Sequence, residues 1–505
     1  MNRPNPSQIR KKAVDKDLKK IVLLETTTQA LARRHAGLAL SFLFLLGVWA
    51  FTAAYTRGVE HGFFIIIAGV VGGYMALNIG ANDVANNVGP AVGSKALTMV
   101  GALIIAAICE AAGAILAGGQ VVNTISRGIV DPAQIADSTT FILAMTSALF
   151  AGALWINLAT YLGAPVSTTH SIVGGVVGAG IAAAGLSAVN WPVMGGIVAS
   201  WVVSPALGGL VAALFYLLIN VAILRQPDKV AAARVWVPIL VAVMAGAFAV
   251  YMASKGLSRI WKPPMWQVLV IGAAIAAAVW AAARPAVAWR SQALENRRKS
   301  INQLFTIPLI ASAALLSFAH GANDVANAVG PLAAVVAAVG TGDVAGGQVA
   351  VPGWVLLVGA IGISAGLALF GPRVIRSVGE EITRLDPMRA FCVALAAAIT
   401  VIIASALGLP VSSTHIAVGG IFGVGFYREF HTNRKRAQPD ETLADLIDTA
   451  GQPEDKLERK LQKAQKRRLV RRSHLMTIVA AWLVTVPLAA GLSALLFFLM
   501  RAVLV

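Results

Sequence analysis

The sequence predicts an all-α polytopic membrane protein with two inverted repeats, in which broken or re-entrant helices lie near the bilayer midplane. Its 505 residues are 57% apolar and only 13% charged, whereas soluble domains carry about 25% charged residues. Apolar stretches of membrane-spanning length recur from one end of the chain to the other. Two short motifs also occur twice each, in the same order. Together these observations indicate a duplicated bundle of transmembrane helices.

Roughly 12 membrane segments are expected in addition to an extra N-terminal helix. The expected parts are a basic cytoplasmic N-terminal extension at 1–36, an extra transmembrane helix at 37–60, a first transmembrane repeat at 61–222, connecting transmembrane helices with a basic loop at 223–300, a second repeat at 301–427, a charged cytoplasmic loop at 428–474, and the C-terminal transmembrane helix of the second repeat at 475–505. The extension has nine Lys or Arg against three acids, and we expect no cleavable signal peptide there.

The net charge of +18 is explained by membrane topology. Lys and Arg gather in loops that fall on the inner side when the basic N-terminus is placed inside, as the positive-inside rule requires. The loop at 428–474 alone holds thirteen Lys or Arg and eight acids. No nucleic-acid recognition motif accompanies this charge. We therefore expect the lipid bilayer, and no nucleic acid, as a partner.

Two pairs of motifs define the repeats. Gly80–Pro90 reads GANDVANNVGP and Gly321–Pro331 reads GANDVANAVGP, while Pro165–Gly175 reads PVSTTHSIVGG and Pro410–Gly420 reads PVSSTHIAVGG. If each apolar segment crosses the membrane once, seven crossings separate the GAND motifs, and this odd number inverts the second half. Inverted repeats with paired motifs are the architecture of secondary transporters, whose substrate site lies near the midplane between the repeats.

Each GAND motif places a carboxylate and two amides between glycines and a proline. An acid inside the bilayer costs about 2.5–3.5 kcal/mol on insertion scales, so it should face a partner or a water-filled cavity. The glycines and the proline predict an interrupted helix, whose carbonyls and side chains suit Na⁺ or a proton. The expected coupling-cation residues are Asp83, Asp324, Asn86, Asn327 and a further intramembrane acid, Glu110, with Asp83 and Asp324 as metal ligands if the cation is Na⁺. Alternatively, these side chains only cap helices or bridge the repeats.

Each PVS motif supplies hydroxyls at an expected helix start. Hydroxyls beside helix N-terminal N–H groups form a cradle that suits a tetrahedral oxyanion. The expected anion-binding hydroxyls belong to Ser167, Thr168, Thr169, Ser412, Ser413 and Thr414. The alternative is that they satisfy backbone groups inside the bundle. The histidines that close the motifs, His170 and His415, could relay protons or hold the loop in shape.

With these motifs, the chain resembles the inorganic phosphate transporter family, the PiT or Pho-4 type of phosphate symporter. The paired GANDVAN and PVS[ST]TH segments look like its signature. The resemblance implies alternating-access import of inorganic phosphate with H⁺ or Na⁺, in which Asn82 and Asn323 join the motif hydroxyls around the substrate. A multi-pass location in the cell inner membrane is expected. Sodium-coupled members tend to carry a Glu where this chain has Ala394, a departure that favours protons.

Other functions are weighed against this one. A sulfate permease could share the scaffold, although an Asp that touches the anion would favour phosphate, which can donate a hydrogen bond. An ion channel would show a continuous pore and no sharp dependence on a coupling gradient. The chain has no Walker A sequence, HExxH pair or nucleophile elbow, so we expect no enzyme and no cofactor, unless Na⁺ is the coupling ion. A homodimer is left open by the sequence.

Overall fold

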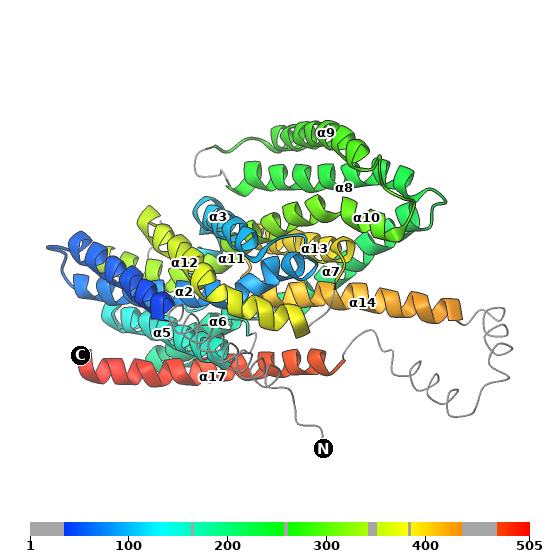
Figure 1. Cartoon of the computed structure of the whole chain (residues 1–505). Coiled ribbons are helices and arrows are strands. Elements are labelled where there is room, and N and C mark those ends of the chain that lie inside the picture. The colour runs from blue at the N-terminus through cyan, green and yellow to red at the C-terminus, as the bar shows by residue number, and fades with distance from the viewer. Residues whose placement is uncertain are drawn as a thin grey trace, which may run out of the picture.

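Helices and their short connections make up the described structure (Figure 1). The computed structural model describes residues 35–162, 166–256, 261–341, 351–381, 385–436 and 472–504. Eleven helices in this part of the chain are long and apolar enough to cross a membrane. The predicted all-α polytopic class is therefore confirmed. Residues 1–34 of the predicted extension and residues 437–471 of the predicted loop lie outside the described residues.

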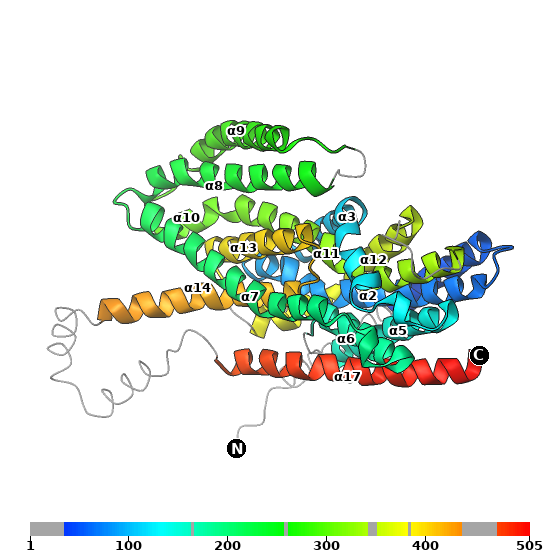
Figure 2. The same cartoon turned by 180° about the vertical axis from the view of Figure 1, so that it is seen from behind.

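The helices are described in the order of the two predicted repeats, whose bounds stay a prediction. The first repeat comprises α2 (Gly62–Gly93), α3 (Met99–Ala117), α4 (Gly119–Asn123), α5 (Ser138–Leu162), α6 (Thr168–Ala184) and α7 (Trp191–Ile219), after an N-terminal helix at His35–Tyr55. The connecting helices are α8 (Lys229–Tyr251), α9 (Met265–Arg290) and α10 (Arg298–Leu304). The second repeat comprises α11 (Thr306–Thr341), α12 (Gly353–Glu381), α13 (Pro387–Ala406), α14 (Ser413–Arg436) and α17 (Arg472–Leu504). In both views α8 and α9 lie together at one edge of the bundle, and α17 lies at the opposite edge (Figure 1, Figure 2).

The helices α5 and α6 form a re-entrant hairpin. The chain before α5 pairs with the chain after α6, because the N–H of Asp131 donates to the carbonyl of Ala188 (2.8 Å) and the N–H of Asn190 donates to that of Ile129 (2.9 Å). At the start of α6 the described part of the hairpin tip is buried, since Val166 and Ser167 are 6% and 3% exposed. The chain thus enters the bundle and returns to the side from which it came.

The helices α13 and α14 form the corresponding hairpin of the second repeat. At the start of α13, Asp386 lies 3.8 Å from a guanidinium nitrogen of Arg298, and that arginine donates to the hydroxyl of Tyr216 (3.2 Å). Tyr427, past the middle of α14, packs edge-to-face on the same Tyr216 with ring centroids 5.5 Å apart. Both ends of this hairpin therefore lie on one side of the molecule.

These hairpins correct one step of the topology predicted from the sequence. The condition that every apolar segment crosses the membrane once does not hold for the four hairpin helices, which are re-entrant, as the predicted fold class allows. Replacing two crossings by a hairpin that returns to the same side leaves the number of crossings between the GAND motifs odd. The inverted orientation of the second repeat is therefore retained.

Contacts between α2 and α11 show the inversion directly. Gly72 of α2 lies against Leu332 and Ala328 of α11, whereas Asp83 lies against His320, which is earlier in α11. Residue numbers rise along one helix as they fall along the other, so the two GAND helices are antiparallel. The corresponding helices of the two repeats therefore run in opposite directions.

The GAND helices are continuous, and the predicted helix interruption is wrong. Both α2 and α11 run through their motifs, with Pro90 and Pro331 inside the helices. The first glycine of each motif instead permits close helix packing. A Cβ at Gly80 would collide with the carbonyl of Ile363 in α12, and a Cβ at Gly321 would collide with the backbone of Glu110 in α3. Small residues at helix interfaces are a common means of close approach in membranes.

Candidate functional site

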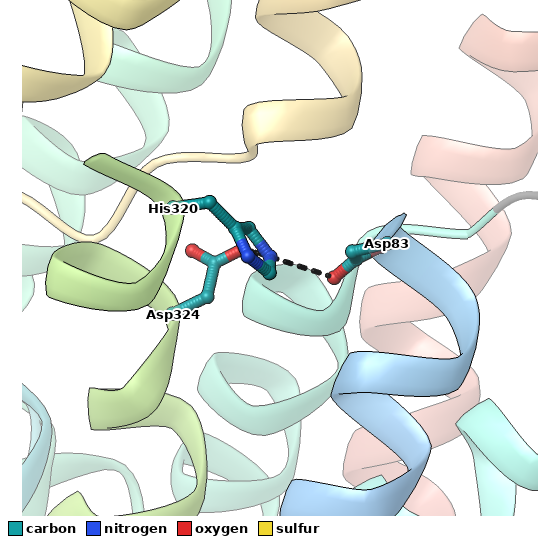
Figure 3. A group of neighbouring side chains, drawn as sticks. All are labelled: Asp83, His320 and Asp324. Carbon is teal, nitrogen blue, oxygen red and sulfur yellow. Dashed lines mark ion pairs between the residues drawn. The ribbon is translucent and has the colours of Figure 1, made fainter. Parts of the chain in front are cut away.

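The site lies where the two GAND helices meet at the hairpin tips. Figure 3 shows Asp83 of α2 facing His320 and Asp324 of α11. The Nε2 atom of His320 lies 2.9 Å from Oδ2 of Asp324 and 3.6 Å from Oδ2 of Asp83. Its Nδ1 atom lies 3.2 Å from Oε2 of Glu110 on α3. The four side chains are at most 1% exposed. One imidazole therefore bridges three buried carboxylates.

The hairpin tips bring hydroxyl groups to the two aspartates. Asp83 accepts hydrogen bonds from Thr168 of the first hairpin (3.0 Å) and from Thr414 of the second (3.3 Å). Asp324 accepts one from Ser413 (3.1 Å). Asp83 is thus shared by both hairpins, although they belong to different repeats and enter from opposite sides.

The second amide of each GAND motif extends this shell of hydrogen bonds. Asn86 donates to the hydroxyl of Thr414 (2.8 Å), and Asn327 donates to that of Thr169 (3.2 Å). Each amide thereby reaches the hairpin of the opposite repeat. The expected coupling-cation residues Asp83, Asp324, Asn86, Asn327 and Glu110 all lie within one connected cluster.

The first amide of each motif anchors a hairpin tip. Asn323 donates to the hydroxyl of Ser405 (2.9 Å) and to the carbonyl of Leu409 (3.1 Å). Asn82 is its counterpart: with its amide oriented so that donors face acceptors, it accepts from Thr160 (2.9 Å) and donates to the carbonyl of Val166 (3.2 Å). These contacts show how the amides position the tips, while their predicted contact with substrate stays a prediction.

The serines of the PVS motifs begin the inner helices of the hairpins. Ser167 accepts from the N–H of His170 (3.1 Å), and Ser412 accepts from that of His415 (3.3 Å). Both hydroxyls therefore act as N-caps. The first turns of α6 and α14 also carry the hydroxyls that reach the aspartates, and helix N-termini with their N–H groups and dipoles favour an anion.

His170 and His415 lie together behind the hydroxyls, where they pack the tips against each other. Their ring centroids are 4.7 Å apart, and His170 also packs edge-on against Trp201 of α7 at 3.8 Å. The indole N–H of Trp201 donates to the carbonyl of Pro410 (3.1 Å). These contacts support the structural interpretation of the histidines, and the proton-relay role stays a prediction.

His320 and Asn87 are site residues that the sequence interpretation missed. His320 immediately precedes the second GAND motif, at the position where the first repeat has Ile79. Asn87 lies inside the first motif, and its amide donates to Oε1 of Glu110 (2.8 Å). Extending the comparison of the repeats by one residue would have exposed His320 as an intramembrane ionisable group.

The cluster also offers a set of cation ligands. Asp83, His320 and Asp324 each present one ligand atom, and these atoms lie within 4.8 Å of one another. A nitrogen with two carboxylate oxygens suits transition metals better than Na⁺, which prefers oxygen ligands alone. Sodium would be held by the two carboxylates with the hydroxyls of the hairpin tips.

Comparison with known proteins identifies the family of the chain. Residues 79–493 match the model of a family described as the phosphate transporter family. The chain belongs to the phosphate transporter family. The match begins next to the first GAND motif and ends in α17, so it covers both hairpins and both aspartates.

Relatives of this family member cover nearly its full length. A protein of Helicobacter pylori strain J99, named as a phosphate permease, is 46% identical over 522 aligned positions that cover 95% of this chain and 98% of that protein. The chloroplastic inorganic phosphate transporter 2-1 of Arabidopsis thaliana is 36% identical, covering 86% of this chain and 71% of its own. A solved structure described as the sodium-dependent phosphate transporter is 35% identical, with a TM-score of 0.76, and covers 87% of this chain and 100% of its own.

Proposed function

We propose that this phosphate transporter family member imports inorganic phosphate across the cell inner membrane by alternating access, driven by a coupling cation. The observation that carries the proposal is Asp83, which accepts hydroxyl hydrogen bonds from both hairpins. A single acid in contact with both repeats allows the occupancy of one pocket to control hairpins that enter from opposite faces. This is the arrangement expected for a midplane site between inverted repeats.

Phosphate is the anion that fits the acids of the pocket. The N-termini of α6 and α14 supply N–H groups for its oxygens, while Asp83 and Asp324 supply acceptors. Hydrogen phosphate has its own O–H, which can donate to a carboxylate. Sulfate has no proton at neutral pH, so a pocket lined by two carboxylates disfavours it.

The proton is the coupling cation that we propose. His320 occupies the space between the three carboxylates, and an imidazole supplies N–H donors there, whereas Na⁺ takes oxygen ligands. The presence of Ala394 on α13, in place of a further acid, agrees with this choice. The solved relative is described as sodium-dependent, so the two cations need a direct comparison.

Uptake into proteoliposomes tests the proposal. Purified protein is reconstituted, and radiolabelled phosphate uptake is measured under an imposed pH gradient, an imposed Na⁺ gradient or neither. We expect accumulation with the pH gradient, competition by excess arsenate and no competition by sulfate. Sulfate accumulation that excess phosphate does not reduce would overturn the cargo, and accumulation under the Na⁺ gradient alone would overturn the proton. Equal flux with and without a gradient would indicate a channel.

A further inference from the structure

The two repeats place corresponding positions on opposite sides of the pocket. On one side some of these positions hold polar residues, whereas their counterparts on the other side are apolar. Close helix contacts establish which positions correspond. Gly113 of α3 lies against the carbonyl of Phe318, and Gly366 of α12 lies against the carbonyl of Leu77, its counterpart in the other repeat. Counting back three residues from each glycine pairs Glu110 with Ile363.

Three polar residues have apolar counterparts under this correspondence. The pairs are Asn87 with Ala328, Glu110 with Ile363, and His320 with Ile79. The three polar members touch one another in a line, whereas their counterparts cannot form hydrogen bonds with their side chains. The aspartates and hairpin hydroxyls are duplicated, but the line from Asn87 through Glu110 to His320 exists once.

Asn87 is placed to fix the orientation of Glu110. Its Nδ2 atom donates to one carboxylate oxygen (2.8 Å), and the other carboxylate oxygen lies 3.2 Å from Nδ1 of His320. Asn87 and Glu110 are 1% and 0% exposed, so bulk water is not available to replace the amide donor. Among the described residues, the titratable groups around this carboxylate beyond His320 include the two aspartates that His320 also faces and the thiol of neighbouring Cys109.

We propose that Asn87 is a positioning residue that directs Glu110 toward His320, and that the line formed by these three residues couples the cation to phosphate movement. The inference rests on the proposed function and deepens it, because it assigns coupling to one side of a duplicated pocket. The anion cradle is supplied by both repeats, and the coupling line is supplied by α2, α3 and α11 alone.

Two substitutions remove the amide donor in different ways. Asn87→Ala introduces the residue that the second repeat has at this position, and Asn87→Leu keeps a similar side-chain size but has no hydrogen-bond donor. We expect each to lower the maximal rate of gradient-driven phosphate uptake by about tenfold, the loss expected for one hydrogen bond to a charged group. The KM for phosphate should change by less than about twofold, since the cradle is intact.

A double variant shows whether Asn87 acts through Glu110. Asn87→Ala should cause no further loss of uptake rate in a Glu110→Gln background, because the carboxylate that it positions is already gone. Asn78→Ala is the matched control: Asn78 is a buried amide of the same helix. It donates to the carbonyl of Tyr74 (2.9 Å) and accepts from Asn157 (3.0 Å), and both contacts lie outside the coupling line. It should leave rate and KM unchanged.

The outcomes separate this inference from the proposed function. A wild-type protein that takes up no phosphate would overturn both. If the wild type is active, an unchanged rate in Asn87→Ala would overturn the inference alone. The inference would also be overturned if Asn87→Ala lowered the uptake rate as much in the Glu110→Gln background as in the wild type. A change in the KM for phosphate without a change in the maximal rate would overturn it as well. A wild-type rate in Asn87→Leu, with a loss of rate in Asn87→Ala, would indicate that Asn87 only fills space and would overturn the inference.

Discussion

At the scale of single residues, the aspartates of the GAND motifs hold the pocket together. Asp83 and Asp324 are each 1% exposed, and each accepts a hydroxyl hydrogen bond from a hairpin while it faces His320. A buried carboxylate with such partners is retained in a membrane only when it has a role, because its insertion is costly.

Neutralising either aspartate should stop transport without unfolding the protein. Asp83→Asn and Asp324→Asn keep the side-chain shape but remove the charge, so we expect gradient-driven uptake to fall to below about 1% of wild type, a loss of about 3 kcal/mol. Thermal unfolding in detergent serves as the folding control. Normal uptake by either variant would remove that acid from the mechanism.

Replacing the bridging imidazole should separate coupling from binding. His320→Gln keeps a polar side chain but loses the second ring nitrogen, so it cannot face Glu110 and both aspartates together. We expect gradient-driven accumulation to fall by about tenfold or more. His61→Gln is the control, since this histidine lies on the surface with 61% of its side chain exposed. An accumulating His320→Gln variant would contradict the proposed role.

At the scale of the helices, the repeats are interlocked. Gly80 of α2 packs on α12, Gly321 of α11 packs on α3, and Gly419 of α14 packs on Pro205 of α7. Each of these contacts joins one repeat to the other. Gly80 and Gly321, which looked like helix breaks, are therefore sites of inter-repeat packing.

A methyl group at the first GAND glycine should destabilise the protein. Gly80→Ala would force α2 and α12 apart, with an expected cost of about 1–3 kcal/mol. Gly89→Ala is the matched control, because no atom lies within 4 Å of a Cβ at that position of the same helix. Thermal unfolding of both variants in detergent should show a lower Tm only for Gly80→Ala. Equal Tm values would contradict the close packing.

At the start of α13, the ion pair between Asp386 and Arg389 makes a contribution to stability that depends on pH. Burial would raise the pKa of Asp386, but hydrogen bonds and charge from Arg389, together with Arg298, hold it below the ordinary value. The folded state thus favours the ionised acid. Its stabilisation is complete above the ordinary Asp pKa of about 3.9, and it is lost as the pH falls through the lower folded pKa.

Asp386→Asn should therefore lower the Tm at neutral pH. The side chain is 17% exposed and forms a 2.9 Å ion pair with Arg389, so we expect a cost of about 1–3 kcal/mol. The difference from wild type should shrink when the pH is lowered below about 4. Thermal unfolding of both proteins at neutral pH and below about pH 4 measures this difference in Tm. A difference in Tm that is the same at both pH values would contradict the role of the ionised acid.

At the scale of the whole molecule, hydropathy and repetition were sufficient to predict the fold class, since both are periodic properties of the sequence. The acids and hydroxyls of the site could be predicted because they lie inside duplicated motifs. His320 lies one residue outside the second motif and has Ile79 as its counterpart, so a comparison limited to the duplicated motifs did not include it. The anchoring role of Asn323 was also hidden, because its partner Ser405 lies 82 residues away along the chain.

Accessibility of the two hairpin tips tests the central claim most directly, namely that hairpins from opposite faces share one pocket. Val166 and Val411 occupy equivalent buried tip positions, and each is replaced by Cys after Cys109 and Cys392 are changed to Ser. A membrane-impermeant maleimide is then applied from either face of sealed vesicles, with and without phosphate and the coupling gradient. We predict that both tips become reactive together from one face, and that changing the gradient transfers reactivity of both to the other face. A tip that reacts from one face only under every condition would contradict a shared, alternately exposed pocket.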